Sequence, residues 1–280
     1  DLFQKNILQN PESVLFNKLD IYVADNGNSV NDILDENNIN LGRHIHLFHN
    51  INAGGSAGFT RCIIEFLRKE PPPTHILLMD DDVSFETESI ERTASFLSLI
   101  KNEYKSDIIG GAMLKEEDPV IQFESGAKWS LMHYDSPQLL GSNLDLTEKQ
   151  NIKNNLNNLS ANYNAWFYCC FPTKTFEENK LPLPFFIHYD DIEYGIRCNK
   201  SIININGICV WHPTENKYSP ALTYYDTRNS LITSFLWDAN KNTRFALIFL
   251  CIKKVIDTTT TYRYIDWDLF YKAVHQVLYR

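Results

Sequence analysis

Three consecutive carboxylates, Asp80-Asp81-Asp82, stand at the end of the apolar run His75-Ile76-Leu77-Leu78-Met79. The run Ile76–Met79 is short and continuously apolar, as is typical of a buried β-strand. Carboxylates this close repel one another and are costly to remove from water, so they lie outside the core. Oxygen donors at the carboxyl end of a strand suit a hard divalent cation that holds a phosphorylated ligand. A solvated acidic turn is the simpler interpretation.

A second acidic cluster lies in the segment Phe186–Arg197, which contains Asp190, Asp191 and Glu193 among aromatic residues. Adjacent carboxylates that share a partly dry pocket raise the pKa of at least one of them. Such a carboxylate is suited to act as a general base that activates a hydroxyl group. The acids could instead decorate a helix N-terminus, where the helix dipole favours them, and the two interpretations are compatible.

Two polar turns follow other predicted strands. Asp25 opens the turn Asp25-Asn26-Gly27-Asn28-Ser29, where it could accept hydrogen bonds from a base or a ribose, or simply close a tight turn. The loop 52–58, with sequence NAGGSAG, opens a helix, and its free N–H groups suit a diphosphate. Arg61, one turn into that helix, could reach a phosphate. The loop matches neither the Walker nor the dinucleotide pattern, and a purely structural loop is the alternative.

One histidine and two tryptophans complete the candidate residues. His212 ends the predicted strand 205–211 and could complete the coordination of a carboxylate-bound cation, which would favour Mn²⁺ over Mg²⁺. A lone histidine is more often structural. Trp129 and Trp166 could stack on sugar rings, although placement in the core is the simpler interpretation of each.

The order of the elements predicts how these residues are positioned. Strands are expected at 19–24, 45–48, 76–79 and 108–113, with helices at 59–69 and 88–103 between them. This alternation predicts an α/β fold with a mainly parallel sheet and helices on both faces. Residues 141–159 are expected to form a polar insertion or helix. The C-terminal third has helical candidates at 221–236, 244–256 and 268–279.

Composition excludes some classes of function. The 280-residue chain has a formal net charge of -9, which argues against nucleic acid as a partner. Its six cysteines show no zinc-binding spacing, so reduced thiols in a cytosolic protein are expected. No signal peptide and no apolar stretch of spanning length are visible. Because the chain starts at Asp1, we expect a fragment whose first strand is missing.

The motifs and their order together resemble the family 2 glycosyltransferases of the GT-A fold. Among these, the chain is most similar to the bacterial UDP-galactofuranose transferases. The likeness extends from Ile21 to about Ser230, and the residues that carry it are Asn52–Phe59, Met79–Val83, Tyr163–Trp166, Phe186–Arg197, Val210–His212 and Thr227–Asn229. One departure is Trp166-Phe167, where two tryptophans are usual.

The resemblance implies an inverting transfer of galactofuranose from UDP-galactofuranose to a glycan or glycolipid acceptor, with Mn²⁺ or Mg²⁺ as cofactor. It also implies a role for each candidate residue. Asp80, Asp82 and His212 would hold the metal, and Asp191 would be the general base with Asp190 in support. The donor would contact Asp25, Asn52, Gly54, Gly55, Arg61, Asp80 and Asp81, and the acceptor would contact Glu124, Trp129 and Trp166.

The expected organisation is a GT-A domain over residues 1–220 and a C-terminal helical region over 221–280. Residues 244–254 are too few to span a bilayer, but they could lie on the cytoplasmic face of a membrane or form an ordinary core helix. Three alternatives remain: a rhamnosyl or other hexosyl transferase, a phosphatase that uses the Asp80-Asp81-Asp82 motif, and a non-catalytic sugar-nucleotide-binding module. The retained Asp191 and His212 argue against the last.

Overall fold

The computed structural model describes residues 4–27, 30, 41–130, 137–155, 160–214, 219–237 and 241–279. Its helices are α2 (Gly55–Leu67), α3 (Thr87–Leu99), α4 (Lys149–Asn155), α5 (Thr173–Asn179), α6 (Asp190–Cys198), α7 (Pro220–Trp237), α8 (Lys241–Thr260) and α9 (Tyr264–Tyr279), with a π-helix at Gln4–Leu8 and a 3-10 helix at Asn102–Tyr104. Its strands are β1 (Ile21–Asp25), β2 (Ile45–His49), β3 (His75–Leu78), β4 (Ile108–Lys115), β5 (Ile121–Glu124), β6 (Ala127–Lys128), β7 (Gln138–Leu139), β8 (Leu144–Asp145), β9 (Cys169–Pro172) and β10 (Ile202–His212).

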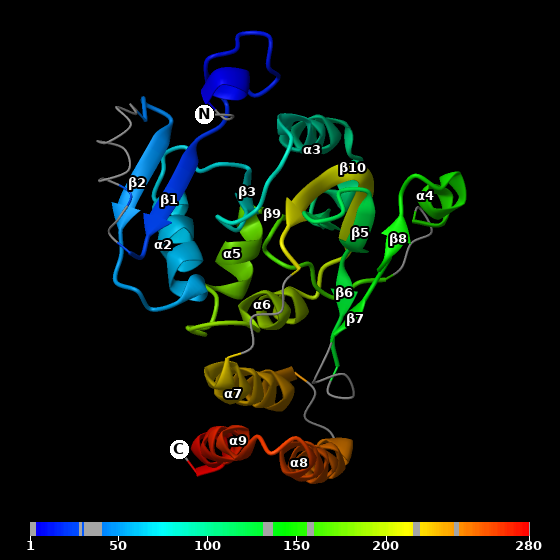
Figure 1. Ribbon diagram of the computed structural model, residues 1–280. Helices are drawn as coiled ribbons and strands as arrows, with labels where there is room; N and C mark the ends of the chain where they lie inside the picture. The colour runs from blue at the N-terminus through cyan, green and yellow to red at the C-terminus, as the bar shows by residue number, and fades with distance from the viewer. Residues whose placement is uncertain are drawn as a thin grey trace.

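The central sheet has the order β3-β9-β4-β5-β8, and β10 pairs with β4. Helices α3 and α5 lie beside this sheet, with α2 next to the separate pair β1-β2 (Figure 1). The α/β class is therefore confirmed, but the expectation of a mainly parallel sheet is wrong. Strands β1-β2 and β4-β10 are parallel, whereas β9 and β5 pair antiparallel with β4, and β9 also pairs antiparallel with β3. Strand β9 enters between two strands that come earlier in the chain.

The core occupies both faces of the sheet, which explains the continuously apolar strands. Ile108 belongs to a cluster that includes Ile63 of α2 and Tyr194 of α6. Its neighbour Ile109 points to the opposite face, into a cluster with Ile90 of α3. Because successive side chains of a strand alternate between faces, a strand covered on both sides has apolar residues throughout.

The predicted elements are found with shifted ends. Helix α2 starts at Gly55 rather than Phe59, so the Gly-rich loop supplies its first turn. The helix expected at 88–103 ends at Leu99 and is followed by the 3-10 turn. The polar stretch 141–159 contains β8 and the short α4, and residues 156–159 lie outside the described part of the chain.

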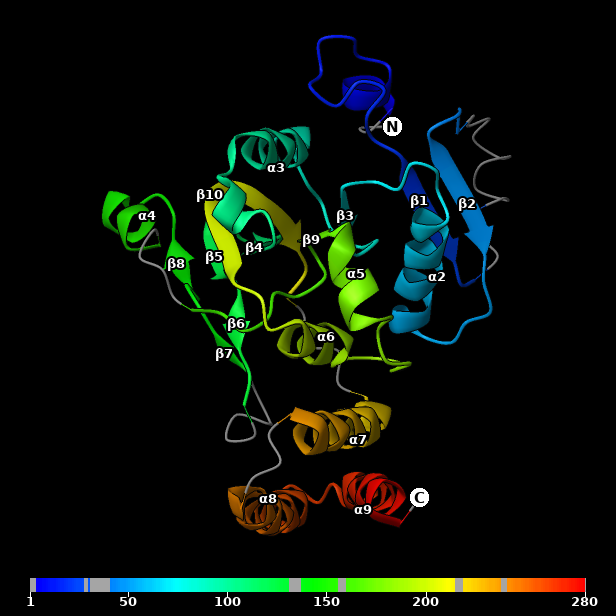
Figure 2. The same ribbon diagram turned by 180° about the vertical axis from the view of Figure 1, so that it is seen from behind.

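Helices α7, α8 and α9 lie at the end of the molecule away from α3, and α7 is placed between α6 and the other two (Figures 1 and 2). They correspond to the three C-terminal helices that the sequence predicts. The proposed boundary between residues 220 and 221 stays a prediction. Among the described residues, no helix is both long and apolar enough to cross a membrane.

Candidate active site

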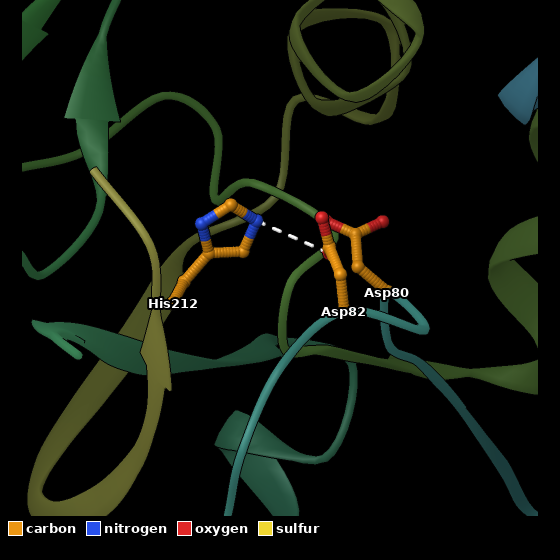
Figure 3. A group of neighbouring side chains, drawn as sticks. All are labelled: Asp80, Asp82 and His212. Atoms are coloured by element: carbon orange, nitrogen blue, oxygen red, sulfur yellow. Dashed lines mark ion pairs between the residues drawn. The ribbon is translucent and has the colours of Figure 1, made fainter. Parts of the chain in front are cut away.

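The three residues of the candidate cation site are positioned by two different strands. Asp80 and Asp82 follow β3, and His212 is the last residue of β10. One ligand atom from each residue lies within 4.8 Å of the other two, and the three side chains converge in Figure 3. Ser84 and Trp211 exchange backbone hydrogen bonds of 2.8 and 2.7 Å, which hold the loop after Asp82 against the end of β10.

The chemistry of this group fits a divalent cation. His212 donates from Nδ1 to the carbonyl oxygen of Pro213 at 2.6 Å, and its Nε2 lies 3.2 Å from Oδ1 of Asp82. A hydrogen bond from one ring nitrogen orients the other as a metal ligand. Burial, together with the charge of Asp82, raises the pKa of Asp80 to about 6, a cost that a bound cation would offset. Two carboxylates and an imidazole suit Mn²⁺ well and also admit Mg²⁺.

The second acidic cluster forms the first turn of α6. Asp190 and Asp191 are its first two residues, and Oδ1 of Asp191 accepts a 2.7 Å hydrogen bond from the N–H of Ile192. Burial raises the pKa of Asp191 well above its usual range, and the like charges of Asp190, Glu124 and Asp80 add to this effect. Burial likewise raises the pKa of Asp190. Carboxylates from three distant segments therefore interact across one site.

A cavity of about 740 Å³ connects the two acidic clusters. Of the residues predicted from sequence, those that line it are Gly55, Asp80, Trp166, Asp190 and Asp191. The far wall comes from the C-terminal helices and consists of Thr223, Asp226, Thr227, Lys253, Lys254, Asp257 and Phe270. Thr227 belongs to the motif Thr227–Asn229, to which no site role was assigned, and the other wall residues carry no motif. Only the fold places them at the cavity.

The Gly-rich loop packs against Phe186, in the segment that leads to Asp190 and Asp191. Gly54 has φ 89°, and a β-carbon there would lie 1.9 Å from the carbonyl oxygen of Phe186. The N–H of Gly55 donates to that same oxygen at 3.1 Å, and the N–H of Gly54 donates to Oδ1 of Asn52 at 3.2 Å. These two N–H groups therefore serve the packing of the loop, and Asn52 itself is exposed.

Five predicted donor residues do not line the cavity: Asn52 and Gly54 of the Gly-rich loop, and Arg61, Asp25 and Asp81. The guanidinium of Arg61 pairs with Glu65 at 3.2 Å and lies over the ring of Phe48, so it is not brought to the cavity. The reason is local, because Glu65 is one helical turn away on the same face. Asp25 is buried, and its carboxylate accepts from the N–H groups of Gly27 and Val30, both at 3.0 Å, as in a tight turn. Asp81 is exposed.

The predicted acceptor residues are buried. Glu124 ends β5, and burial raises its pKa to about 7. Trp129 packs edge-on against Tyr189, with ring centroids 6.2 Å apart, and Trp166 packs against Phe59 at 5.0 Å. Both indole N–H groups are buried without a hydrogen-bond partner among the described residues. Both tryptophan rings are therefore packed in the core, and Trp166 also lines part of the cavity.

Comparison with known proteins agrees with the motifs. No protein-family model matches the chain. The galactofuranosyltransferase GlfT2 of Mycolicibacterium smegmatis is 28% identical over 214 residues, which cover 71% of this chain and 32% of that protein. The GlfT2 of Mycobacterium tuberculosis is 26% identical over 253 residues, or 85% of this chain and 39% of that protein. The chain thus spans 32% to 39% of the length of these curated relatives.

A solved structure extends the likeness to the fold. GalNAc-T7, solved with UDP, GalNAc and Mn²⁺, has a TM-score of 0.52 at 11% sequence identity, over 78% of this chain and 42% of that one. At this identity the likeness concerns the fold alone. The resemblance that the sequence motifs carry is thereby confirmed: the chain is a GT-A glycosyltransferase homologue, related in sequence to the bacterial galactofuranosyltransferases.

Proposed function

We propose that the chain is an inverting, metal-dependent glycosyltransferase that moves galactofuranose from UDP-galactofuranose to a hydroxyl group of a glycan or glycolipid acceptor. The observation that carries the proposal is the single cavity that Asp80 of the cation-binding group shares with Asp190 and Asp191. Asp80, which we assign to the donor, and the acid pair, which we assign to the acceptor, then line the same cavity. The names of the two relatives support the choice of sugar.

In this proposal, Asp80, Asp82 and His212 hold Mn²⁺ or Mg²⁺, which neutralises the charge of the leaving diphosphate. Asp191 takes the proton of the acceptor hydroxyl as its oxygen attacks the anomeric carbon on the face opposite the UDP. The raised pKa of Asp191 makes it a better proton acceptor than an ordinary carboxylate. Asp190 orients the helix turn, and Trp166 and Glu124 border the acceptor sugar.

A donor screen tests this function. The protein is incubated with Mn²⁺ and a panel of nucleotide sugars, and the released nucleotide is measured with and without EDTA. We expect the highest release from UDP-galactofuranose, its loss in EDTA and its return with Mn²⁺. Full turnover in excess EDTA would contradict the metal assignment. Phosphate release from a simple phosphate ester, without nucleotide release, would support the phosphatase alternative.

We also propose that α8 contacts the cytoplasmic face of a membrane. The exposed side of α8 is an apolar stripe at helical spacing, formed by Phe245, Ile248, Phe249, Ile252 and Ile256. An amphipathic helix of this kind can lie in the lipid interface without crossing it. Co-sedimentation with lipid vesicles should fall in the variant Phe249→Ser/Ile252→Ser. Equal sedimentation of this variant and the wild type would contradict the contact.

A further inference from the structure

The three residues before the acid pair form a strained turn. His188 has φ 57° and Tyr189 has φ 72°, so two consecutive residues with bulky side chains adopt the left-handed conformation. This conformation is uncommon for residues other than glycine, and a bulky side chain such as that of Tyr189 makes it more costly still. It persists only where the surrounding structure imposes it, and such positions cluster at functional sites.

Helix α7 supplies the contacts that impose this turn. Asn229 is fully buried, and its side-chain nitrogen donates to the carbonyl oxygens of Ile187 at 2.9 Å and His188 at 3.1 Å. Asp226, one turn earlier on the same face of α7, lies 2.7 Å from Nδ1 of His188. Three polar contacts from one helix therefore hold both the backbone and the side chain of the turn.

The identity of Asn229 fits this role better than a role within α7 itself. Asparagine is a poor helix former, and a buried amide without partners is costly. Both hydrogen bonds of its nitrogen go to the turn, and its Oδ1 accepts from Arg228 at 3.0 Å. The neighbouring buried Ser234 instead donates to Ser230 within its own helix. The side chain of Asn229 is therefore directed at the turn.

We propose that Asn229 and Asp226 are positioning residues for the sugar transfer: they fix the turn 187–189 and so aim the carboxylates of Asp190 and Asp191 into the cavity opposite Asp80. The inference rests on the proposed function. Asp190 directly follows the turn, so the course of the turn sets where both carboxylates lie. A displacement of a reacting group by 1 Å can cost about a hundredfold in rate. In this account α7 is part of the catalytic scaffold.

The first test is Asn229→Ala, with Ser234→Ala as the control at a buried position on the same helix. We expect Asn229→Ala to lower kcat by about tenfold or more, as for other misplaced reacting groups. The KM for the nucleotide sugar and the metal-dependent binding of UDP should stay close to wild type, because the turn lines the cavity whereas Asp82 and His212 do not. Asp226→Ala should lower kcat less, since it removes one contact of three.

The second test is rescue by glycine. His188→Gly and His188→Ala both remove the imidazole, but only glycine adopts the left-handed conformation without strain. In the Asn229→Ala background, His188→Gly should restore kcat to within about threefold of the His188→Gly single variant, since glycine removes the strain. His188→Ala should not restore it. Thermal unfolding of the same proteins measures the strain in the turn independently of activity. The unfolding midpoint should be higher for the variant with His188→Gly than for the variant with His188→Ala.

Three outcomes are decisive. A wild-type kcat for Asn229→Ala, or equal kcat values for the glycine and alanine double variants, would overturn the positioning role while the proposed function stands. A wild-type protein that transfers no sugar from any donor would instead contradict the proposed function. In that case the order of the unfolding midpoints alone decides whether α7 holds the turn.

Discussion

The two acidic clusters differ in what surrounds them. Asp80 and Asp82 come with a histidine whose Nε2 faces them, and the Asp82 side chain is 64% exposed. Asp190 and Asp191 are desolvated together with Glu124, and burial raises the pKa of each. Among the residues that the structure describes, the only group of three side chains with metal-ligand spacing is the first one.

This contrast shows how one residue type serves two kinds of chemistry. Asp82 is open to solvent, and a cation bound beside it would offset the burial that raises the pKa of Asp80. Carboxylates in a dry pocket among like charges gain affinity for a proton. The first cluster therefore suits the diphosphate of a donor, and the second suits the hydroxyl proton of an acceptor.

The largest effect is expected when Asp191 and Asp190 are replaced by asparagine, one at a time. These variants test whether the second cluster supplies the general base. Asp191→Asn keeps the shape but removes the proton acceptor, so we expect transfer at saturating donor to fall by about a hundredfold or more. Asp190→Asn should cost less if Asp190 only orients the turn. Rates of nucleotide release measure both. Wild-type transfer by Asp191→Asn would move the base to another residue.

The metal side is tested at His212. Replacing it with alanine removes one of three ligands, so we expect Mn²⁺ affinity to weaken by about one to two orders of magnitude. Titration of Mn²⁺ against activity, and calorimetry with UDP present, measure the change. His275→Ala is a suitable control, because His275 is an exposed histidine of α9 and does not line the cavity. An unchanged titration would show that His212 is structural.

The dependence of the transfer rate on pH tests whether Asp191 is the general base. The base must be deprotonated, and the pKa of Asp191 is raised by burial and then by the charge of Asp190. The rate should therefore fall as pH drops, at a pH above the usual range of a carboxyl group. Asp190→Asn removes one cause of the shift, so the acidic limb of the pH profile should move to lower pH. A limb that stays in place would contradict the coupling of the two acids.

The smallest expected effect is a change in the free energy of unfolding when Glu124 is replaced. Burial raises its folded pKa to about 7, so the folded state binds the proton more tightly than the unfolded state. Stability is then full below the unfolded pKa and is lost as pH rises through the folded one. Glu124→Gln removes this penalty and should raise the unfolding free energy at pH 8 by up to about 3 kcal/mol. The gain should shrink toward pH 5, and thermal unfolding at the two values measures it.

Local patterns predicted most elements, and the family resemblance implied the meeting of Asp80, Asp82 and His212. Strand β4 is continuously apolar because both faces are covered, and that pattern is visible in the sequence. Asp82 and His212 are 130 positions apart, yet each follows the carboxyl end of a strand, where side chains from different strands meet.

Long-range pairing accounts for what the sequence did not predict. The antiparallel insertion of β9 between β3 and β4 depends on the whole sheet, and the four residues of β9 carry no signal of direction. Arg61 could pair with a phosphate of the donor or with Glu65, and its position in the sequence does not decide between the two. The pair His188–Asp226 and the wall from α8 require the docking of helices that lie far along the chain.

The division of labour between the clusters is tested most directly by metal-dependent UDP binding in two matched variants. Calorimetry with UDP and Mn²⁺ is carried out on Asp82→Asn and Asp191→Asn, each of which exchanges one carboxylate for an amide. We expect that Asp82→Asn loses the Mn²⁺-dependent binding, whereas Asp191→Asn binds UDP and Mn²⁺ as the wild type does. Retained binding in Asp82→Asn, or lost binding in Asp191→Asn, would contradict this division of labour.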